Sequence, residues 1–299
     1  MTRLCRELAA HGCDGLFVGG STGELPLLDE DDRRALVAAA SEGVDSKTVI
    51  YAGVSGCGIK QTRRYARNAA ADGAQVAVVM APFFLKLRQV ELLHYFISIA
   101  DASPIPIAIY HHPRAATALN PETAAKAAEH PNIVAIKDTS PDMQRVQAML
   151  AATSHSKIAL LQGNETLIRD SLSLGAAGMV SALANVAPEW HADLYRAAQA
   201  HKRGEADEMQ DRITRLWTMF KLEPIGKSIA AFTYSLRLGL ERRGWLQNKF
   251  GIVEGFEPTD VFRHSLTDHF IACGVPTAGS FGVRIDAGHA VQEESRDVA

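Results

Sequence analysis

The feature that most constrains this chain is a series of short apolar runs, each followed by a helical pattern. The runs are rich in Val, Ile and Ala and recur at intervals of roughly 20 to 33 residues, as expected for consecutive βα units. Runs that are apolar on both faces are typical of a parallel sheet covered by helices. The predicted strands are Gly15–Val18, Val49–Val54, Val76–Ala81, Pro106–His111, Ile133–Lys137, Ala159–Gln162 and Gly178–Ala182.

Helical patterns fill the gaps between these strands. They span Arg3–Ala10, Asp31–Ser41, Lys60–Ala71, Gln89–Ala100, Pro121–His130 and Asn164–Leu174. Two doubly wound halves would also fit alternating strands and helices, but the chain has no GxGxxG or P-loop motif. Serial βα units without a domain break favour a TIM (β/α)₈ barrel, an α/β fold.

The chain divides into three regions by pattern. Residues 1–187 hold strands two to eight of the predicted barrel, because the sequence opens in the helix that should follow strand one. Residues 188–243 read as a C-terminal helical region. Residues 244–299 form an atypical tail that we expect to be partly disordered. The three further predicted helices are Pro188–His201, Glu205–Lys221 and Ile225–Leu240.

Composition narrows the possible functions. The 299 residues are 47 % hydrophobic and carry a formal charge of −3, without a Lys/Arg cluster. We therefore expect neither nucleic acid nor a membrane as partner. The amphipathic start lacks the apolar segment of a signal peptide. The four cysteines form no CxxC pair and no disulfide framework, which is typical of a cytoplasmic protein.

A single lysine interrupts the apolar run that begins at Ile133. Strict alternation along a strand places Ile133, Ala135 and Lys137 on one side, and the intervening residues on the other. Burying an ammonium costs several kcal/mol unless it is paired, and burial lowers the pKa of lysine below about 10.4. Such an amine can form a Schiff base with a ketone. The alternative is a lysine at a strand end that reaches water or pairs with Asp138.

Two more features fall at the carboxyl ends of predicted strands, where barrels build their active sites. The loop Gly19–Glu24, Gly-Gly-Ser-Thr-Gly-Glu, can turn tightly and aim amide N–H groups and two hydroxyls at an anion. Tyr110 ends another strand, above the small residue Ala108, just as Lys137 lies above Ala135. Two adjacent strands thus point a phenol and an amine at one pocket.

These motifs resemble those of the dihydrodipicolinate synthase and N-acetylneuraminate lyase family, in spacing and in order. The resemblance runs to about Leu240 and includes Gln162–Glu165 and Gly178–Pro188. It implies a class I aldolase that acts on pyruvate or another 2-oxo acid and needs no cofactor. By this resemblance Lys137 forms the Schiff base and Tyr110 shuttles protons.

The same resemblance assigns further residues. Ser21 would relay protons to Tyr110, and Thr22 with its backbone would hold the substrate carboxylate. Gly163, Asn164 and Glu165 match a loop that contacts the variable end of the substrate, and Val180 matches a residue of the pyruvate pocket. Ordinary loop and core positions remain the alternative for these last four residues.

The Tyr-His-His-Pro segment also raises the question of a metal. Neighbouring strand residues face opposite sides, so His111 and His112 cannot jointly bind one ion. No further set of ligands accompanies them, and we predict no metal. We expect His112 to face the pocket and contact substrate, and His111 to pack outside or to cap a helix.

Two departures from the synthase branch narrow the function. That branch has a carboxylate-binding arginine where this chain has Ala115, with Arg114 one residue early. Its second tyrosine comes from a neighbouring subunit, and the matching segment here, Ala81–Phe84, has no hydroxyl. We therefore predict a lyase that cleaves or forms a bond between pyruvate and an aldehyde, with a 2-oxo-3-deoxy (sugar) acid as substrate.

Three alternatives stay open. The same lysine imine could support a dehydratase of such an acid, dihydrodipicolinate synthase activity fits less well, and a truncated non-catalytic 2-oxo acid binder is the third. Family members begin with a strand that this chain lacks, and an open barrel exposes two unpaired edges. The only strand-like piece of the tail, Ser280–Ile285, is our candidate to fill the gap. By resemblance we also expect a homodimer or homotetramer.

Overall fold

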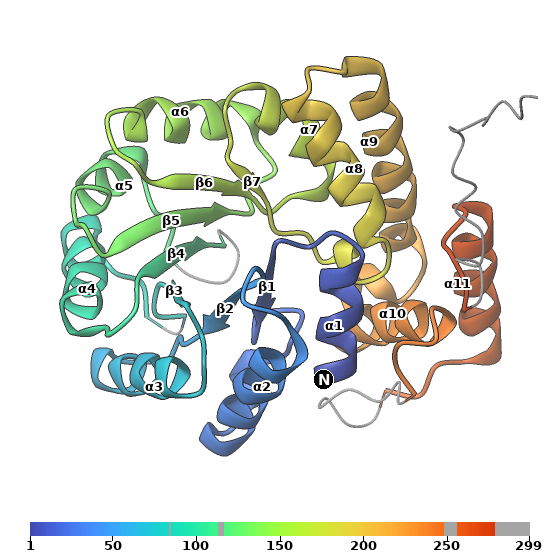
Figure 1. Cartoon of the computed structure of the whole chain (residues 1–299), viewed down its shortest axis with the longest axis horizontal. Coiled ribbons are helices and arrows are strands. Elements are labelled where there is room, and N and C mark those ends of the chain that lie inside the picture. Colours follow the sequence, from blue (N-terminus) through green and yellow to red (C-terminus); the bar gives the residue numbers. More distant parts are fainter. Residues whose placement is uncertain (84, 113–116, 248–255, 279–299) are drawn as a thin grey trace, which may run out of the picture.

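The computed structural model describes residues 1–83, 85–112, 117–247 and 256–278. Seven parallel strands form one sheet in sequence order, curled into a half-barrel (Figure 1). They are β1 (Gly15–Val18), β2 (Val49–Gly53), β3 (Val76–Met80), β4 (Ile107–His111), β5 (Ile133–Asp138), β6 (Ala159–Gln162) and β7 (Gly178–Met179). Among the described residues β1 and β7 each pair with one strand only, as expected for a barrel that lacks its first strand. The alternating β/α order confirms a TIM-barrel-like fold.

Helices connect the strands and cover the outside of the curl (Figure 1). They are α1 (Thr2–Ala10), η1 (Leu25–Leu27), α2 (Glu30–Gly43), α3 (Ile59–Ala71), α4 (Gln89–Ala102), α5 (Pro121–Ala127), α6 (Met143–Thr153), η2 (Glu165–Leu167) and α7 (Ile168–Ser173). Side-chain caps determine where some of these helices begin. Asp29 accepts a hydrogen bond from the Asp32 N–H at the start of α2, and Asn120 does the same for Thr123 before a proline at the first position of α5.

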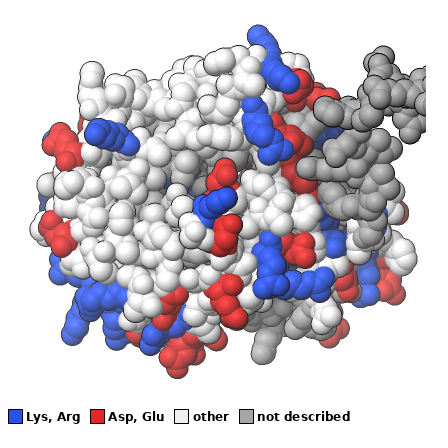
Figure 2. All heavy atoms as spheres, in the orientation of Figure 1, with Lys and Arg blue, Asp and Glu red and all other residues white. Residues whose placement is uncertain are grey.

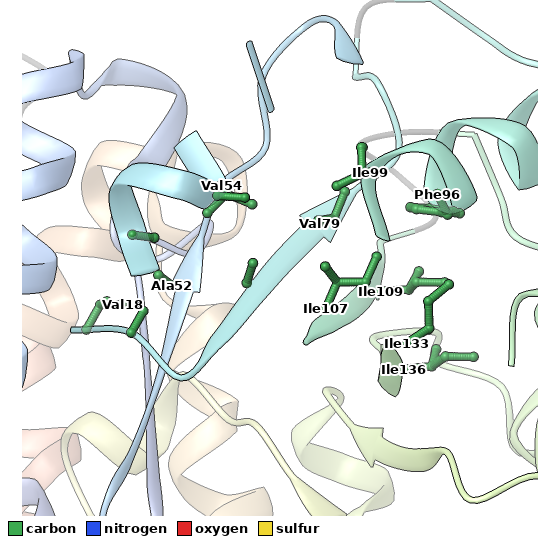
Figure 3. Packing of buried hydrophobic residues seen from close by; sticks show 14 of the residues in the cluster. Val18, Ala52, Val54, Val79, Phe96, Ile99, Ile107, Ile109, Ile133 and Ile136 are labelled. Carbon is green, nitrogen blue, oxygen red and sulfur yellow. The ribbon is translucent and has the colours of Figure 1, made fainter. Parts of the chain in front are cut away.

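The sheet has an apolar layer on each face. On the outer face, branched side chains such as Ile107, Ile109 and Ile136 pack against Phe96 and Ile99 of α4 (Figure 3). Burying one such side chain fully contributes roughly 1.5–3 kcal/mol. The inner face holds a second layer formed by Val76, Val78, Ala108, Tyr110 and Ala135. Burial on both sides explains why the strand runs do not alternate between apolar and polar residues.

A β-bulge in β5 corrects the predicted side-chain pattern. Ile107 pairs with Ile133, but the next residue, Ala108, pairs with Ala135, so Val134 is an extra residue. Ile133 packs in the outer layer and Val134 against the inner one. The prediction that Ile133 shares a side with Lys137 is therefore wrong, because a bulge breaks strict alternation. Beyond the bulge Ala135 lies inward beneath Lys137, as predicted.

The C-terminal helices build a second core around Leu194, Ile213, Leu216 and Leu266. They are η3 (Leu183–Asn185), α8 (Pro188–Gln199), α9 (Arg203–Trp217), η4 (Thr218–Lys221), η5 (Ile225–Lys227), α10 (Ile229–Arg242) and α11 (Asp260–Ala272). The sequence pattern did not predict α11. Its buried residues Phe262, Leu266 and Phe270 recur every four positions, but exposed Val261 and Ile271 obscure that period.

Smaller differences concern the ends of elements. The last strand stops at Met179, three residues before the predicted end, and α5 stops at Ala127. The predicted helix Asn164–Leu174 is instead η2 followed by α7, with Asn164 as the cap. Ser280–Ile285, the predicted gap-filling strand, lies outside the described residues.

The face of the molecule in Figure 2 carries basic and acidic side chains interspersed. Its mixed character agrees with a formal charge of only −3 over 65 charged side chains, counted as 31 basic and 34 acidic residues. Within the described part of the chain, no helix is both long and apolar enough to cross a membrane.

Candidate active site

The center of the site is the pair Tyr110 and Lys137, which lie opposite each other on β4 and β5. Tyr110 is buried and Lys137 is half-buried. The Lys137 ammonium nitrogen lies 4.2 Å from the centroid of the Tyr110 ring. Lys137 does not pair with Asp138, whose carboxylate binds His111 and Arg145 on the outer face. The structure thus brings the predicted amine and phenol together at one end of the half-barrel.

The loop after β1 places the Ser21 hydroxyl beside the Tyr110–Lys137 pair. Ser21 Oγ lies 3.3 Å from the Tyr110 hydroxyl, at hydrogen-bond distance. Thr22 follows Ser21 in the same turn. The turn depends on glycine: Gly19 has φ +65°, and a Cβ on Gly53 of β2 would stand 1.9 Å from the Gly19 carbonyl oxygen. A side chain at Gly53 would therefore clash with this loop, and one at Gly19 would strain its backbone.

The same loop is anchored from the far end of the chain. Glu24 is buried in a left-handed conformation with φ 54°, and its carboxylate accepts a 2.7 Å hydrogen bond from Arg237 of α10. A buried carboxylate needs such a partner because desolvation by itself is costly. The C-terminal helices therefore help to position Ser21 and Thr22.

Phe17 of β1 is a pocket residue that the sequence analysis missed. Its ring centroid lies 5.0 Å from the Lys137 nitrogen and 5.9 Å from the Tyr110 ring in an edge-to-face arrangement. Two aromatic rings thus flank the amine, one from each of two strands. The available signal was position: Phe17 sits two residues before the Gly19–Glu24 loop on a strand with alternating faces.

Gly163, after β6, lies against the lysine stem. A Cβ there would stand 3.0 Å from Lys137 Cε and 2.4 Å from Thr139 Oγ1. Its N–H donates a 2.7 Å hydrogen bond to the Asp138 carbonyl. Thr139 was also missed by the sequence analysis, and its buried hydroxyl has no hydrogen-bond partner among the described residues. A hydroxyl so placed can form a hydrogen bond with a bound substrate.

The remaining predicted residues surround this center less closely. The His112 ring lies 5.9 Å from the Tyr110 ring, edge to face, whereas His111 points to the outer face. Asn164 caps η2 through hydrogen bonds to Thr166, which is a structural role. Val180 joins the neighbouring strand through a 2.8 Å hydrogen bond from its N–H to the Gln162 carbonyl.

Glu165 is buried and turned toward the segment after β7. Its Oε1 accepts a 3.0 Å hydrogen bond from the Ala182 N–H and lies 3.3 Å from Ser181 Oγ. Burial raises the pKa of the Glu165 carboxyl, against the opposing effects of the Ala182 N–H and the Lys137 charge. Ser181 in turn contacts His191 of α8, and burial lowers the pKa of that imidazole to about 4.

A second buried network joins β4, β5 and α6 on the outer face. His111 Nδ1 lies 3.0 Å from Asp138 Oδ1, and Arg145 Nε donates to Asp138 Oδ2 at 3.1 Å. Burial alone would raise the pKa of Asp138, but hydrogen bonds and charge from His111 and Ser140 outweigh it and lower that pKa to about 2. His111 and Asp138 directly follow Tyr110 and Lys137, so their contact joins β4 to β5 beside the site. Among the described residues no group of three potential ligands is arranged to hold a metal ion.

Known proteins with similar sequences point to one family. The sequence pattern of the Dihydrodipicolinate synthetase family matches residues 1–248. A 4-hydroxy-tetrahydrodipicolinate synthase of Streptomyces coelicolor is 36 % identical over 215 residues, covering 72 % of this chain and 70 % of that protein. A protein of the same name from Stenotrophomonas maltophilia is 31 % identical over 242 residues, covering 81 % of each.

Solved structures show the same fold. A prophage protein of the dihydrodipicolinic acid synthase family from E. coli K12, in complex with pyruvate, has a TM-score of 0.85 at 23 % identity and 92 % coverage of both chains. Dihydrodipicolinate synthase from Aquifex aeolicus has a TM-score of 0.83 at 24 % identity, again with 92 % of both chains covered. The chain belongs to the dihydrodipicolinate synthetase family and is a lyase of that family.

Proposed function

We propose that this protein is a class I aldolase that cleaves or forms the carbon–carbon bond between pyruvate and an aldehyde through a Schiff base on Lys137. Its substrate in this proposal is a 2-oxo-3-deoxy acid. The observation that carries the proposal is the placement of Tyr110 on β4 beside Lys137 on β5, with Ser21 at hydrogen-bond distance from the phenol.

The chemistry follows from these three groups. The neutral Lys137 amine adds to the keto carbon, and Tyr110 donates its proton as water leaves. This step gives a protonated imine, which is an electron sink, and a Tyr110 phenolate. The Tyr110 oxygen takes the proton from the substrate's C4 hydroxyl, the C3–C4 electrons move toward the imine, and the aldehyde leaves. Tyr110 then returns a proton to C3, and water releases pyruvate. Ser21 and Thr22 bind and orient: one hydroxyl holds the phenol, and the loop holds the substrate carboxylate.

A second candidate is 4-hydroxy-tetrahydrodipicolinate synthase activity. The names of the curated relatives favour it. Two replacements argue against it. Ala115 stands where the synthase branch has its arginine, and Ala81–Phe84 lacks the second tyrosine. Ala115 and Phe84 lie outside the described residues, so this argument rests on sequence. A dehydratase that uses the same imine stays the third candidate, and a non-catalytic 2-oxo acid binder the fourth.

The first prediction is a covalent adduct on Lys137. Borohydride reduction with pyruvate, followed by intact-mass and peptide mass spectrometry, should give one reduced adduct on the peptide that contains Lys137. Lys137→Ala should abolish it, because no other amine lies beside the Tyr110 ring in the described site. Lys157→Ala is the matched control, because Lys157 is an exposed lysine just before β6. This variant should still form the adduct.

Product analysis then separates the candidates. Release of pyruvate with an aldehyde from a 2-oxo-3-deoxy sugar acid supports the aldolase, and loss of water without cleavage supports the dehydratase. Formation of 4-hydroxy-tetrahydrodipicolinate would favour the synthase. Binding of pyruvate to folded protein with no adduct would replace the catalytic proposal by the binder. Light scattering tests the proposed homodimer or homotetramer; one solved relative is a monomeric variant.

A further inference from the structure

Three hydrogen-bonded side chains lead away from the lysine: buried Glu165 after β6, half-buried Ser181 after β7 and buried His191 on α8. Ser181 Oγ lies 3.3 Å from Glu165 Oε1 and 2.9 Å from His191 Nε2. Glu165 and His191 are both only 4 % exposed. Neither Ser181 nor His191 has a part in the reaction proposed above.

The hydrogen-bond donors among these three side chains can be assigned by starting from His191. His191 Nδ1 lies 2.8 Å from the carbonyl oxygen of Ala187. A carbonyl only accepts, so Nδ1 carries a proton. In a neutral imidazole Nε2 is then bare, and it must accept the hydroxyl proton of Ser181.

The state of Glu165 follows from the single hydroxyl proton of Ser181. Once that proton is donated to His191, Ser181 can only accept, and it accepts from the Leu183 N–H at 3.1 Å. An attractive contact to Glu165 then requires the proton to come from Glu165, as a neutral carboxylic acid. The Ala182 N–H still donates to the same Glu165 oxygen.

One other assignment satisfies every hydrogen bond: a protonated His191, with Ser181 donating to an ionised Glu165. The two assignments differ by shifting two protons along the chain. Burial opposes both charges, raising the pKa of Glu165 and lowering that of His191. Of the two assignments, burial therefore favours the neutral one.

We propose that His191, acting through Ser181, keeps Glu165 as a neutral acid beside Lys137. An ionised Glu165 would repel the carboxylate of an incoming 2-oxo acid and would stabilise the ammonium of Lys137, which is not a nucleophile. His191 and Ser181 are thus positioning residues for the imine step, a role that rests on the proposed function. The charge and tautomer of His191 are properties of the fold and can be tested without any reaction.

The charged groups around the chain are few. Lys137 on β5 acts on Glu165, and Glu189 acts on His191 from two residues earlier on α8. From α9 the amide of Gln210 donates to the Glu165 carbonyl at 2.9 Å, and it does not titrate.

The first test uses ¹⁵N-histidine NMR on the wild-type chain from pH 5 to pH 8. The resonances of His191, identified by their loss in His191→Gln, should show a neutral ring protonated at Nδ1 over this range. A protonated ring at pH 7, or a ring protonated only at Nε2, would overturn the proposal. This test does not depend on pyruvate or on Lys137.

The second test follows the rate of borohydride-trapped adduct formation against pH. His191→Leu frees the Ser181 hydroxyl to donate to Glu165, which favours the carboxylate and makes the Lys137 amine more basic. The acid limb of the rate profile should shift to higher pH by about one unit. At a fixed pH on that limb, adduct formation should slow by about tenfold. The double variant with Glu165→Gln, which cannot ionise, should lose this shift.

Two controls complete the design. His191→Gln keeps an acceptor for Ser181 and should leave the limb in place. His264→Leu removes an exposed histidine whose Nδ1 likewise bonds the carbonyl four residues earlier on its helix, Asp260, and should change nothing. An unshifted profile in folded His191→Leu, or a shift that persists in the double variant, contradicts the proposal. Absence of any adduct in wild type would instead refute the proposed function, and the NMR result would then decide alone.

Discussion

At the scale of single residues, the site depends on close approaches that only glycine allows. Gly53 faces the Gly19 carbonyl, and Gly163 faces the Lys137 stem. Neither glycine has a positive φ, so the reason is space and not backbone conformation. Sequence alone indicated that Gly163 belongs near the pocket but gave no sign of the contact made by Gly53.

We predict that Gly53→Ala destabilises the fold by roughly 1–3 kcal/mol and weakens pyruvate binding. The added methyl would stand 1.9 Å from the Gly19 oxygen and must displace the loop that carries Ser21. Denaturant unfolding and the pyruvate dependence of adduct formation measure the two effects. Gly204→Ala is the control: it adds a methyl in α9 with nothing within 4 Å, and should be neutral or stabilise by up to about 1 kcal/mol. Equal stability of the two variants would contradict this account.

At the scale of elements, the pairing of β4 with β5 decides whether amine and phenol meet. The predicted alternation was right for Tyr110 and Lys137 because both lie beyond the bulge at Val134. It was wrong for Ile133, on the other side of that bulge. Just past the two site residues, His111 and Asp138 close the strand ends with a buried ion-pair network.

We predict that Asp138→Asn destabilises the protein by about 2 kcal/mol at pH 7, since the folded carboxyl has a pKa of about 2 against an ordinary 3.8. A depressed pKa stabilises the fold above pH 3.8, and this contribution is lost as the pH falls toward 2. Urea unfolding should therefore show a smaller difference between wild type and variant at pH 3 than at pH 7. Asp101→Asn removes an exposed partner of His130 and should cost less than about 1 kcal/mol at either pH. A pH-independent difference for Asp138→Asn would refute the linkage.

At the scale of the whole molecule, the C-terminal helices and the half-barrel form one unit around the site. Arg237 of α10 reaches Glu24 across more than two hundred residues of sequence, and His191 of α8 reaches the segment after β7. The expected family function thus depends on helices that contribute no reacting group.

We predict that Arg237→Met destabilises the protein by roughly 3 kcal/mol or more, because it removes the guanidinium from a buried carboxylate. It should also weaken pyruvate binding, since Glu24 ends the loop of Ser21 and Thr22. Adding Glu24→Gln should recover part of the stability by removing the buried charge. Arg212→Met, which breaks an exposed pair with Glu208 on α9, should have little effect in the same thermal unfolding assay. A double variant no more stable than Arg237→Met would show that the buried charge is not the cause.

The amino-acid sequence by itself determined the serial βα order, the parallel sheet and the meeting of Tyr110 with Lys137. These depend on local periodicity and on neighbouring strands, which a single chain reveals. Only the tertiary structure decided the bulge at Val134, the ring of Phe17 beside the lysine, the burial of α11 and the contact from Glu165 through Ser181 to His191. Each of these depends on how segments far apart in sequence pack and share hydrogen bonds, and no local pattern records that.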